Sequence, residues 1–286
     1  MPKSADELVQ LLDLETIDTN LYRGIQPDTL LQRVFGGQVA AQALVAGTRT
    51  VEPPLSVHSL HSYFLRPGDT AVPIVYDVER MRDGRSFSTR RVVARQHGRP
   101  IYFMTISFQV PEDGFEHQDV MPAVPDPEES LGMADLIRKR SPDRAEQWLT
   151  EWAALDLRAI GDSRPGGELP NDVRPAQSRL WIRVSGRLDD SELTHKAAFT
   201  YASDMTLLGS SLVPHGVLVW SPTVQSASLD HSIWFHRPFR ADEWLLYDQV
   251  SPSASGARGL ALGRVFSRDG RLVATVAQEG LIRPHG

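Results

Sequence analysis

Three polar residues in the second half of the chain, Asp204, Ser228 and Gln278, have the side chains needed to hold and deprotonate one water molecule. A carboxylate can take a proton from water as a general base, while a hydroxyl and an amide can orient that water. Each residue also has a structural explanation. Asp204, in Y-A-S-D-M-T-L-L-G, would suit the N-cap of a helix, and a serine or an amide beside an apolar strand needs only a hydrogen-bond partner. Together, however, the three predict a hydrolytic site.

Other common kinds of catalytic site have no support in the sequence. The nearest approach to G-x-S-x-G is G-R-S-F-S at residues 84–88, whose last position is wrong for a nucleophile elbow. The glycine-rich phosphate and dinucleotide motifs are absent. The chain has no cysteine, which excludes a thiol nucleophile and thiolate metal ligands. His58 and His61 are three residues apart on a predicted strand, on opposite faces, so we expect no metal site.

The composition narrows the class of protein. The chain has 286 residues, of which 41% are hydrophobic, enough for a substantial core. Its 30 basic and 36 acidic residues give a net charge of -6, which argues against a nucleic-acid partner. No apolar run approaches the roughly 20 residues of a membrane span, and the N-terminus lacks the apolar core of a signal peptide. We therefore expect a cytoplasmic protein.

Two segments repeat the same pattern at a domain-sized separation. Residues 57–67 (V-H-S-L-H-S-Y-F-L-R-P) are echoed by residues 229–238 (L-D-H-S-I-W-F-H-R-P), and both end in an Arg-Pro turn after an alternating strand. This spacing is too long for a solenoid repeat and indicates two copies of one module. We expect an N-terminal module at 1–112, a partly helical linker at 113–175 and a C-terminal module at 176–286.

Each module is expected to be α+β, with an antiparallel sheet wrapped on one buried helix. The run after Phe35, G-G-Q-V-A-A-Q-A-L, is small and apolar on all sides, as a buried helix should be. In the second module we expect the central helix to run from Asp204 to about Leu212, so that Gln38 and Asp204 would open corresponding helices. Further helices are expected at 5–14 and after Ser141, and strands near 86–96, 101–108, 180–184, 231–236, 244–251, 257–266 and 272–279.

The longest motifs resemble one family. F-G-G-Q-V-A-A-Q-A-L at 35–44, V-H-S-L-H-S-Y-F-L-R-P-G at 57–68 and D-H-S-I-W-F-H-R-P at 230–238 are similar to those of the TesB-type acyl-CoA thioesterase II family. The resemblance runs from about residue 8 to residue 284. It implies a double hotdog fold, in which two tandem modules form one continuous antiparallel sheet around two central helices.

The resemblance also implies the reaction, which is hydrolysis of fatty acyl-CoA to fatty acid and CoA. Asp204 would activate water, and Ser228 and Gln278 would orient it, without a cofactor, a metal or a covalent intermediate. Ser228 stands where some members carry threonine, and the hydroxyl is retained. The family further implies assembly into homodimers or homotetramers.

Five residues are weaker candidates for a role in the site. The helix that starts at Gly37 and Gln38 offers free backbone N–H groups for the carbonyl oxygen that becomes an oxyanion. His58 could assist catalysis, although a histidine on a packed strand is more often a hydrogen-bonded structural residue. Trp148 and Trp152 would form a helix face that packs on the sheet, or the mouth of an acyl tunnel.

Two other functions remain open from the sequence. One is a non-catalytic acyl-CoA-binding or regulatory protein, against which the retention of all three polar residues argues. The other is an enoyl-CoA hydratase on the same fold, which pairs an aspartate with a histidine five residues later. That position is Gly209 here, so hydration is disfavoured.

Overall fold

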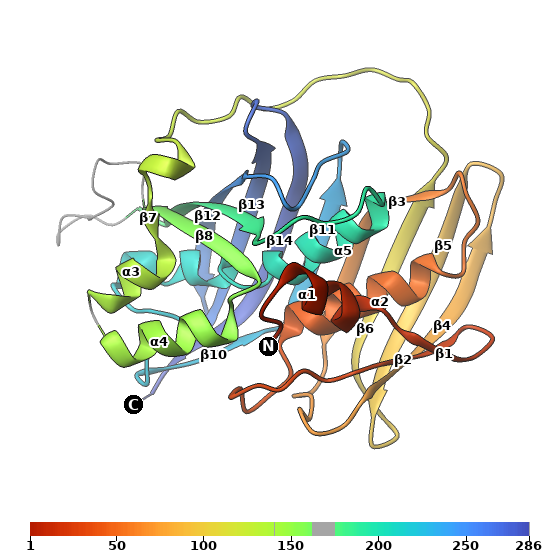
Figure 1. Ribbon diagram of the computed structural model, residues 1–286, viewed down its shortest axis with the longest axis horizontal. Helices are drawn as coiled ribbons and strands as arrows, with labels where there is room; N and C mark the ends of the chain where they lie inside the picture. Colours follow the sequence, from red (N-terminus) through yellow and green to blue (C-terminus); the bar gives the residue numbers. More distant parts are fainter. Residues whose placement is uncertain (140, 162–174, 286) are drawn as a thin grey trace.

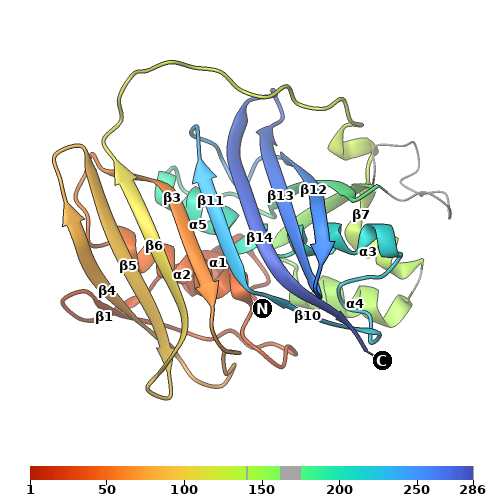
Figure 2. The ribbon, with the colours of Figure 1, turned by 180° about the vertical axis from the view of Figure 1, so that it is seen from behind.

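The computed structural model describes residues 1–139, 141–161 and 175–285. One antiparallel sheet of 14 strands curves around two central helices, α2 (Gly36–Thr48) and α5 (Glu192–Ser203), which lie on its concave face (Figure 1). Seen from behind, the long strands of both halves form one surface (Figure 2). The continuous sheet around two helices confirms the predicted double hotdog architecture.

The strands follow the predicted positions closely. Their order across the sheet is β1-β2-β4-β5-β6-β3-β11-β14-β13-β12-β9-β8-β7, and β10 pairs with β14 outside that path. The bounds in the first half are β1 (Glu15–Asp18), β2 (Leu21–Gly24), β3 (Ser56–Phe64), β4 (Ile74–Asp83), β5 (Phe87–Gln96) and β6 (Arg99–Gln109). Those in the second half are β9 (Gln177–Val184), β10 (Val224–Ser228), β11 (Asp230–Phe235), β12 (Leu245–Ser255), β13 (Arg258–Ser267) and β14 (Leu272–Pro284).

The two halves join where β3 pairs with β11. His61 lies opposite Ser232 at the centre of this junction, and the two side chains are hydrogen-bonded at 3.2 Å. The two Arg-Pro turns repeat the same contact, because Arg66 donates to the carbonyl of Pro100 and Arg237 to that of Leu272. Pairing the repeated strands protects the edge that each single module would leave open.

Helices α2 and α5 pack closely where the start of α2 meets the end of α5. A Cβ atom built on Gly37 would lie 2.2 Å from the carbonyl oxygen of Tyr201, which is too close for any side chain. The alanines of α2, including Ala40 and Ala43, are fully buried. Small residues on α2 therefore let the backbones approach, as the all-round apolar pattern predicted.

The predicted start of the second central helix was wrong. Helix α5 ends at Ser203, and Asp204 is its C-cap; the following residues form a 3₁₀ turn at Leu207–Ser211. The helix begins after Ser191, whose hydroxyl accepts a hydrogen bond from the N–H of Thr194. That serine, followed by Glu192 in the first turn, was the overlooked helix-start signal.

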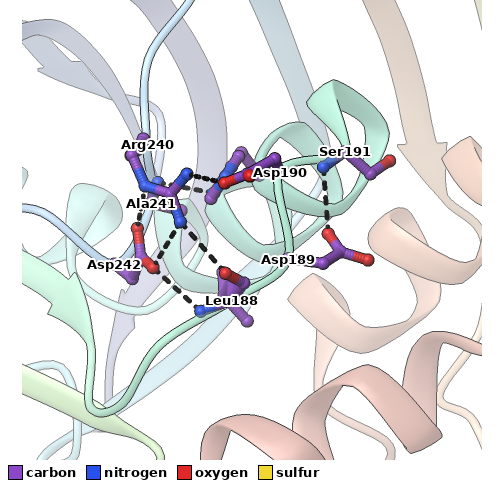
Figure 3. A network of polar contacts seen from close by, with 8 residues as sticks. Leu188, Asp189, Asp190, Ser191, Arg240, Ala241 and Asp242 are labelled. Carbon is purple, nitrogen blue, oxygen red and sulfur yellow. Dashed lines mark hydrogen bonds and ion pairs between the residues drawn. The ribbon is translucent and has the colours of Figure 1, made fainter.

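A polar network holds the loop before α5 in place (Figure 3). Arg240 binds Asp190 and Asp242, and Asp242 accepts the N–H of Leu188. Asp189 accepts the N–H of Ser191. These contacts hold the beginning of α5 against the chain ahead of β12. They therefore help to position α5, and with it Asp204 at the C-terminal end of this helix.

The position of Asp204 at the end of α5 determines which residue corresponds to it in the first module. Asp204 directly follows the last residue of α5, and Arg49 directly follows the last residue of α2. Arg49, and not Gln38, is therefore the positional counterpart of Asp204. The guanidinium of Arg49 binds Asp13 and the carbonyl of Leu14.

The segment between the modules adds helices and two further strands. It contains β7 (Leu131–Gly132), α3 (Met133–Arg138), α4 (Pro142–Glu151) and β8 (Leu155–Gly161), and β8 extends the sheet by pairing with β9. Residues 162–174 of the predicted linker lie outside the described residues. The N-terminal helix α1 (Ala5–Leu12) begins after Ser4 as expected and ends two residues early. No helix in the described part of the chain is long and apolar enough to cross a membrane.

Candidate active site

Asp204, Ser228 and Gln278 come together at the end of α5, as the sequence predicted. The Nε2 atom of Gln278 donates to Oδ1 of Asp204 at 2.5 Å and to Oγ of Ser228 at 3.0 Å. The hydroxyl of Ser228 lies 3.4 Å from the same carboxylate oxygen. Ser228 ends β10 and Gln278 lies in the adjacent β14, so strand pairing places the hydroxyl and the amide side by side under the helix end.

Burial raises the pKa of Asp204 to about 6, against the opposing effect of hydrogen bonds from Gln278, the N–H of Gly37 and Ser228. The position at the C-terminus of α5 acts in the same direction as burial, because the negative end of the helix dipole disfavours a carboxylate. The N-cap position expected from the sequence would have lowered this pKa. The observed environment therefore makes a base that is ionised at neutral pH and still basic enough to accept a proton.

A cavity of about 390 Å³ opens onto the carboxylate from between the modules. Gly36, Phe64 and Tyr102 line it from the first module, and Asp204 and Ser228 from the second. A Cβ atom on Gly36 would lie 2.6 Å from Oδ2 of Asp204 and 2.9 Å from the ring of Phe64. Glycine at position 36 thus keeps the space in front of the carboxylate open.

Gln38 does not join the site. Its amide donates to Oε1 of Gln26 and to the carbonyl of Ile25, and its backbone N–H donates to the carbonyl of Phe35. The expectation that Gln38 supplies a free N–H group is therefore wrong. The backbone N–H of Gly37 does face the site, where it lowers the pKa of Asp204 against the larger effect of burial.

His58 lies on the other side of the sheet. Its Nε2 atom is 2.8 Å from the hydroxyl of Ser107, which alternates along β6 with the buried Ile106 and Phe108. That alternation puts Ser107, and His58 with it, on the face opposite the central helices. The structure supports the structural explanation of this histidine.

Several cavity residues were not singled out by the sequence. Phe64 and Arg66 belong to the repeated strand and turn, so the duplication was the feature of the sequence that could have indicated their place near the site. Tyr102 lies in an apolar strand, where nothing distinguishes it from core residues. Among the described residues, no three His, Asp or Glu side chains are grouped closely enough to bind a metal ion.

Comparisons with known proteins agree with this fold. A family model described as "Acyl-CoA thioesterase N-terminal domain" matches residues 26–109, and a model described as "Acyl-CoA thioesterase" matches residues 164–281. The chain is 41% identical to human acyl-coenzyme A thioesterase 8, over 96% of this chain and 88% of that protein. It is 40% identical to acyl-CoA thioesterase 2 of Haemophilus influenzae, over 97% of each chain.

Among solved structures, the acyl-CoA thioesterase II TesB2 of Mycobacterium marinum is 46% identical, with a TM-score of 0.82 over 98% of this chain and 99% of that one. Fold and site define a double hotdog enzyme that acts on thioesters. The sequence identity near 40% over almost the whole chain shows the particular family: the chain belongs to the acyl-CoA thioesterase family.

Proposed function

We propose that this protein hydrolyses fatty acyl-CoA to free fatty acid and CoA through a water molecule activated by Asp204. The observation that carries the proposal is the contact of one partly buried carboxylate, of raised pKa, with both Ser228 and Gln278 at the wall of an open cavity. Incubation of the pure protein with palmitoyl-CoA and a thiol-detecting reagent tests it. Release of free CoA is expected, and a protein that binds acyl-CoA without releasing CoA would contradict the proposal.

The attacking water would bind in the cavity, beside the carboxylate of Asp204 and the hydroxyl of Ser228. Asp204 takes one proton from it as the water oxygen attacks the thioester carbon. Gln278 is fully buried and donates to both Asp204 and Ser228, so it would orient the water through these two groups. Ser228 fixes the carboxylate and the amide relative to each other.

The thioester carbonyl would lie at the N-terminus of α2. The first turn of a helix carries N–H groups without helical acceptors and the positive end of the helix dipole. Gln38 already donates within its own turn, which leaves the N–H groups of Gly36 and Gly37 as the donors. As the proton moves to Asp204, its carboxylate loses charge, so the attraction of the Gly37 N–H to the base weakens while its attraction to the developing oxyanion grows.

The pH profile of kcat/KM should show the titration of Asp204. Protonated Asp204 cannot act as a base, so activity should rise with pH, reach half its maximum near pH 6 and level off above pH 7. Below the midpoint the loss should approach about tenfold per pH unit. Initial rates from pH 4.5 to 8.5, with circular dichroism to verify folding, measure this. A flat profile between pH 5 and pH 8 would show that no group with this pKa is essential.

Ser228→Ala and Gln278→Ala should each cost less than replacement of Asp204, and the double variant should lose less than the product of the two single losses. Both residues serve one water, and groups that act as a unit are not additive. The four kcat values of this cycle test the prediction. Strictly multiplicative losses would indicate separate roles.

The chain should have one working site. The counterpart of Asp204 at the end of α2 is Arg49, which cannot act as a base and is held by Asp13. Calorimetric titration with a non-hydrolysable acyl-CoA analogue is expected to give one site per chain. Two equivalent sites would contradict the arrangement.

The proposal extends to assembly and location. We infer homodimers or homotetramers on the strength of the family, and a cytoplasmic location from the absence of cysteine in the sequence. Light scattering of the pure protein distinguishes these states from a monomer.

A further inference from the structure

A second cavity lies against the opposite side of the candidate active site. It has a volume of about 220 Å³ and is lined by Phe35 and Met205, the direct neighbours of Gly36 and Asp204. Gly36 and Asp204 themselves line the first cavity. The two cavities are therefore lined by neighbouring residues of the same two segments, where α2 begins and α5 ends.

Seven of the ten residues that line the second cavity are apolar, and four of these seven are aromatic. Ile137, Trp148 and Trp152 line it from α3 and its neighbour α4, and Trp220 lines it from the loop ahead of β10. We call this cavity the tryptophan pocket. The ring of Phe35 packs edge-on against Trp152 at 4.9 Å, which joins the pocket to the start of α2.

The charged groups of the tryptophan pocket are bound to protein atoms. The carboxylate of Glu151 accepts from the hydroxyl of Thr29 and the N–H of Leu30. Arg144 donates to the carbonyl of Trp220 and so links α4 to the loop that carries this ring. An apolar ligand can thus occupy the pocket while both charged groups keep hydrogen bonds to protein atoms.

We propose that the tryptophan pocket holds the acyl chain of the substrate, while the CoA moiety occupies the first cavity. The proposal rests on the proposed function. The acyl chain and the thiol leave a thioester carbon in different directions, so a carbon held beside Gly36 and Asp204 directs one group toward each cavity. Two exposed arginines, Arg33 and Arg66, line the first cavity. Guanidinium groups bind phosphates well, which suits the CoA side.

The size of the pocket indicates the chain length that it can enclose. Because a cavity of about 150 Å³ holds benzene, a volume of about 220 Å³ suits on the order of eight to ten carbons. The value of kcat/KM should rise about three- to fourfold for each methylene group of the acyl chain that the pocket encloses, and it should level off for longer chains. The segment between the two hotdog modules, rather than either module, would then determine chain-length preference.

The test compares decanoyl-CoA with butyryl-CoA through the ratio of their kcat/KM values. The fraction of active enzyme cancels in this ratio, so a variant that merely folds less well leaves it unchanged. Trp148→Ala, which removes a wall, should lower the ratio at least about tenfold. Ile137→Phe, which fills the pocket, should also lower it. Leu149→Ala is the matched control, since Leu149 is the next residue of α4, is 45% exposed and does not line the pocket.

Each outcome decides the proposal. A ratio that stays at the wild-type value in both pocket variants would overturn it. A change in Ile101→Trp, which fills the first cavity, with none in Ile137→Phe would place the acyl chain in the first cavity instead. A wild-type enzyme that releases no CoA from any acyl-CoA would contradict the proposed function itself, whereas turnover with no dependence on chain length would contradict only the pocket.

Discussion

Replacing Asp204 by asparagine is expected to lower kcat at least about a hundredfold and to leave the fold intact, the usual scale for losing a general base. The amide keeps the shape of the side chain and can still accept a hydrogen bond from Gln278, but it cannot take a proton from water. Steady-state kinetics with palmitoyl-CoA measures the loss. A well-folded asparagine variant with full activity would remove Asp204 from the mechanism.

A nearby carboxylate provides the control for this experiment. Asp230, on β11, accepts the N–H of Glu279, and burial also raises its pKa, but it does not line either cavity. Asp230→Asn should keep activity near the wild-type value. A similar loss in both variants would indicate a general effect of charge rather than a base at position 204.

Stability provides an independent check on Asp204→Asn. The pKa of Asp204 is higher in the folded protein than its usual value, so the stabilisation present at low pH is lost as pH rises through about 6. A neutral residue avoids that loss. The melting temperature of the variant at pH 8 should therefore be no lower than that of the wild type, and the difference should shrink toward pH 4.

Gly37→Ala is expected to destabilise the protein by about 3 kcal/mol, at the upper end of the usual cost of overpacking. The new methyl group would meet the carbonyl oxygen of Tyr201 at 2.2 Å, and a backbone atom cannot rotate away as a side chain can. The helices must separate, which also moves Asp204, three residues after Tyr201. Activity should fall together with stability, as urea denaturation and kinetics would show.

Gly47→Ala is the matched control on the same helix. Its new methyl group would lie 2.4 Å from the terminal carbon of Ile106, which can move by rotating a side chain. Alanine also favours a helix by about 1 kcal/mol over glycine, so the net change should be small. An equal loss of stability in both variants would show that the close contact at Tyr201 has no special cost.

The sequence by itself determined the architecture of this protein. Two copies of one strand-and-turn pattern predicted a duplicated sheet, and the alternation of apolar residues placed most strands within a few positions of where they lie. The candidate catalytic residues were also accessible, because Asp204, Ser228 and Gln278 are polar groups in otherwise apolar surroundings. Such patterns can be detected in the sequence because a strand or helix that buries one face has apolar residues at a regular local spacing.

Only the tertiary structure decided how the site is assembled. Asp204 was expected to begin a helix, where local preference favours a carboxylate, and instead follows the end of one. Gln38 and His58 were weaker candidates for the site. The side chain of Gln38 is hydrogen-bonded to Ile25 and Gln26 instead, and His58 lies on the opposite face of the sheet. The Gly37–Tyr201 contact and the tryptophan pocket join segments distant in the chain. Such contacts depend on how packed elements meet in space, which no local pattern of residues contains.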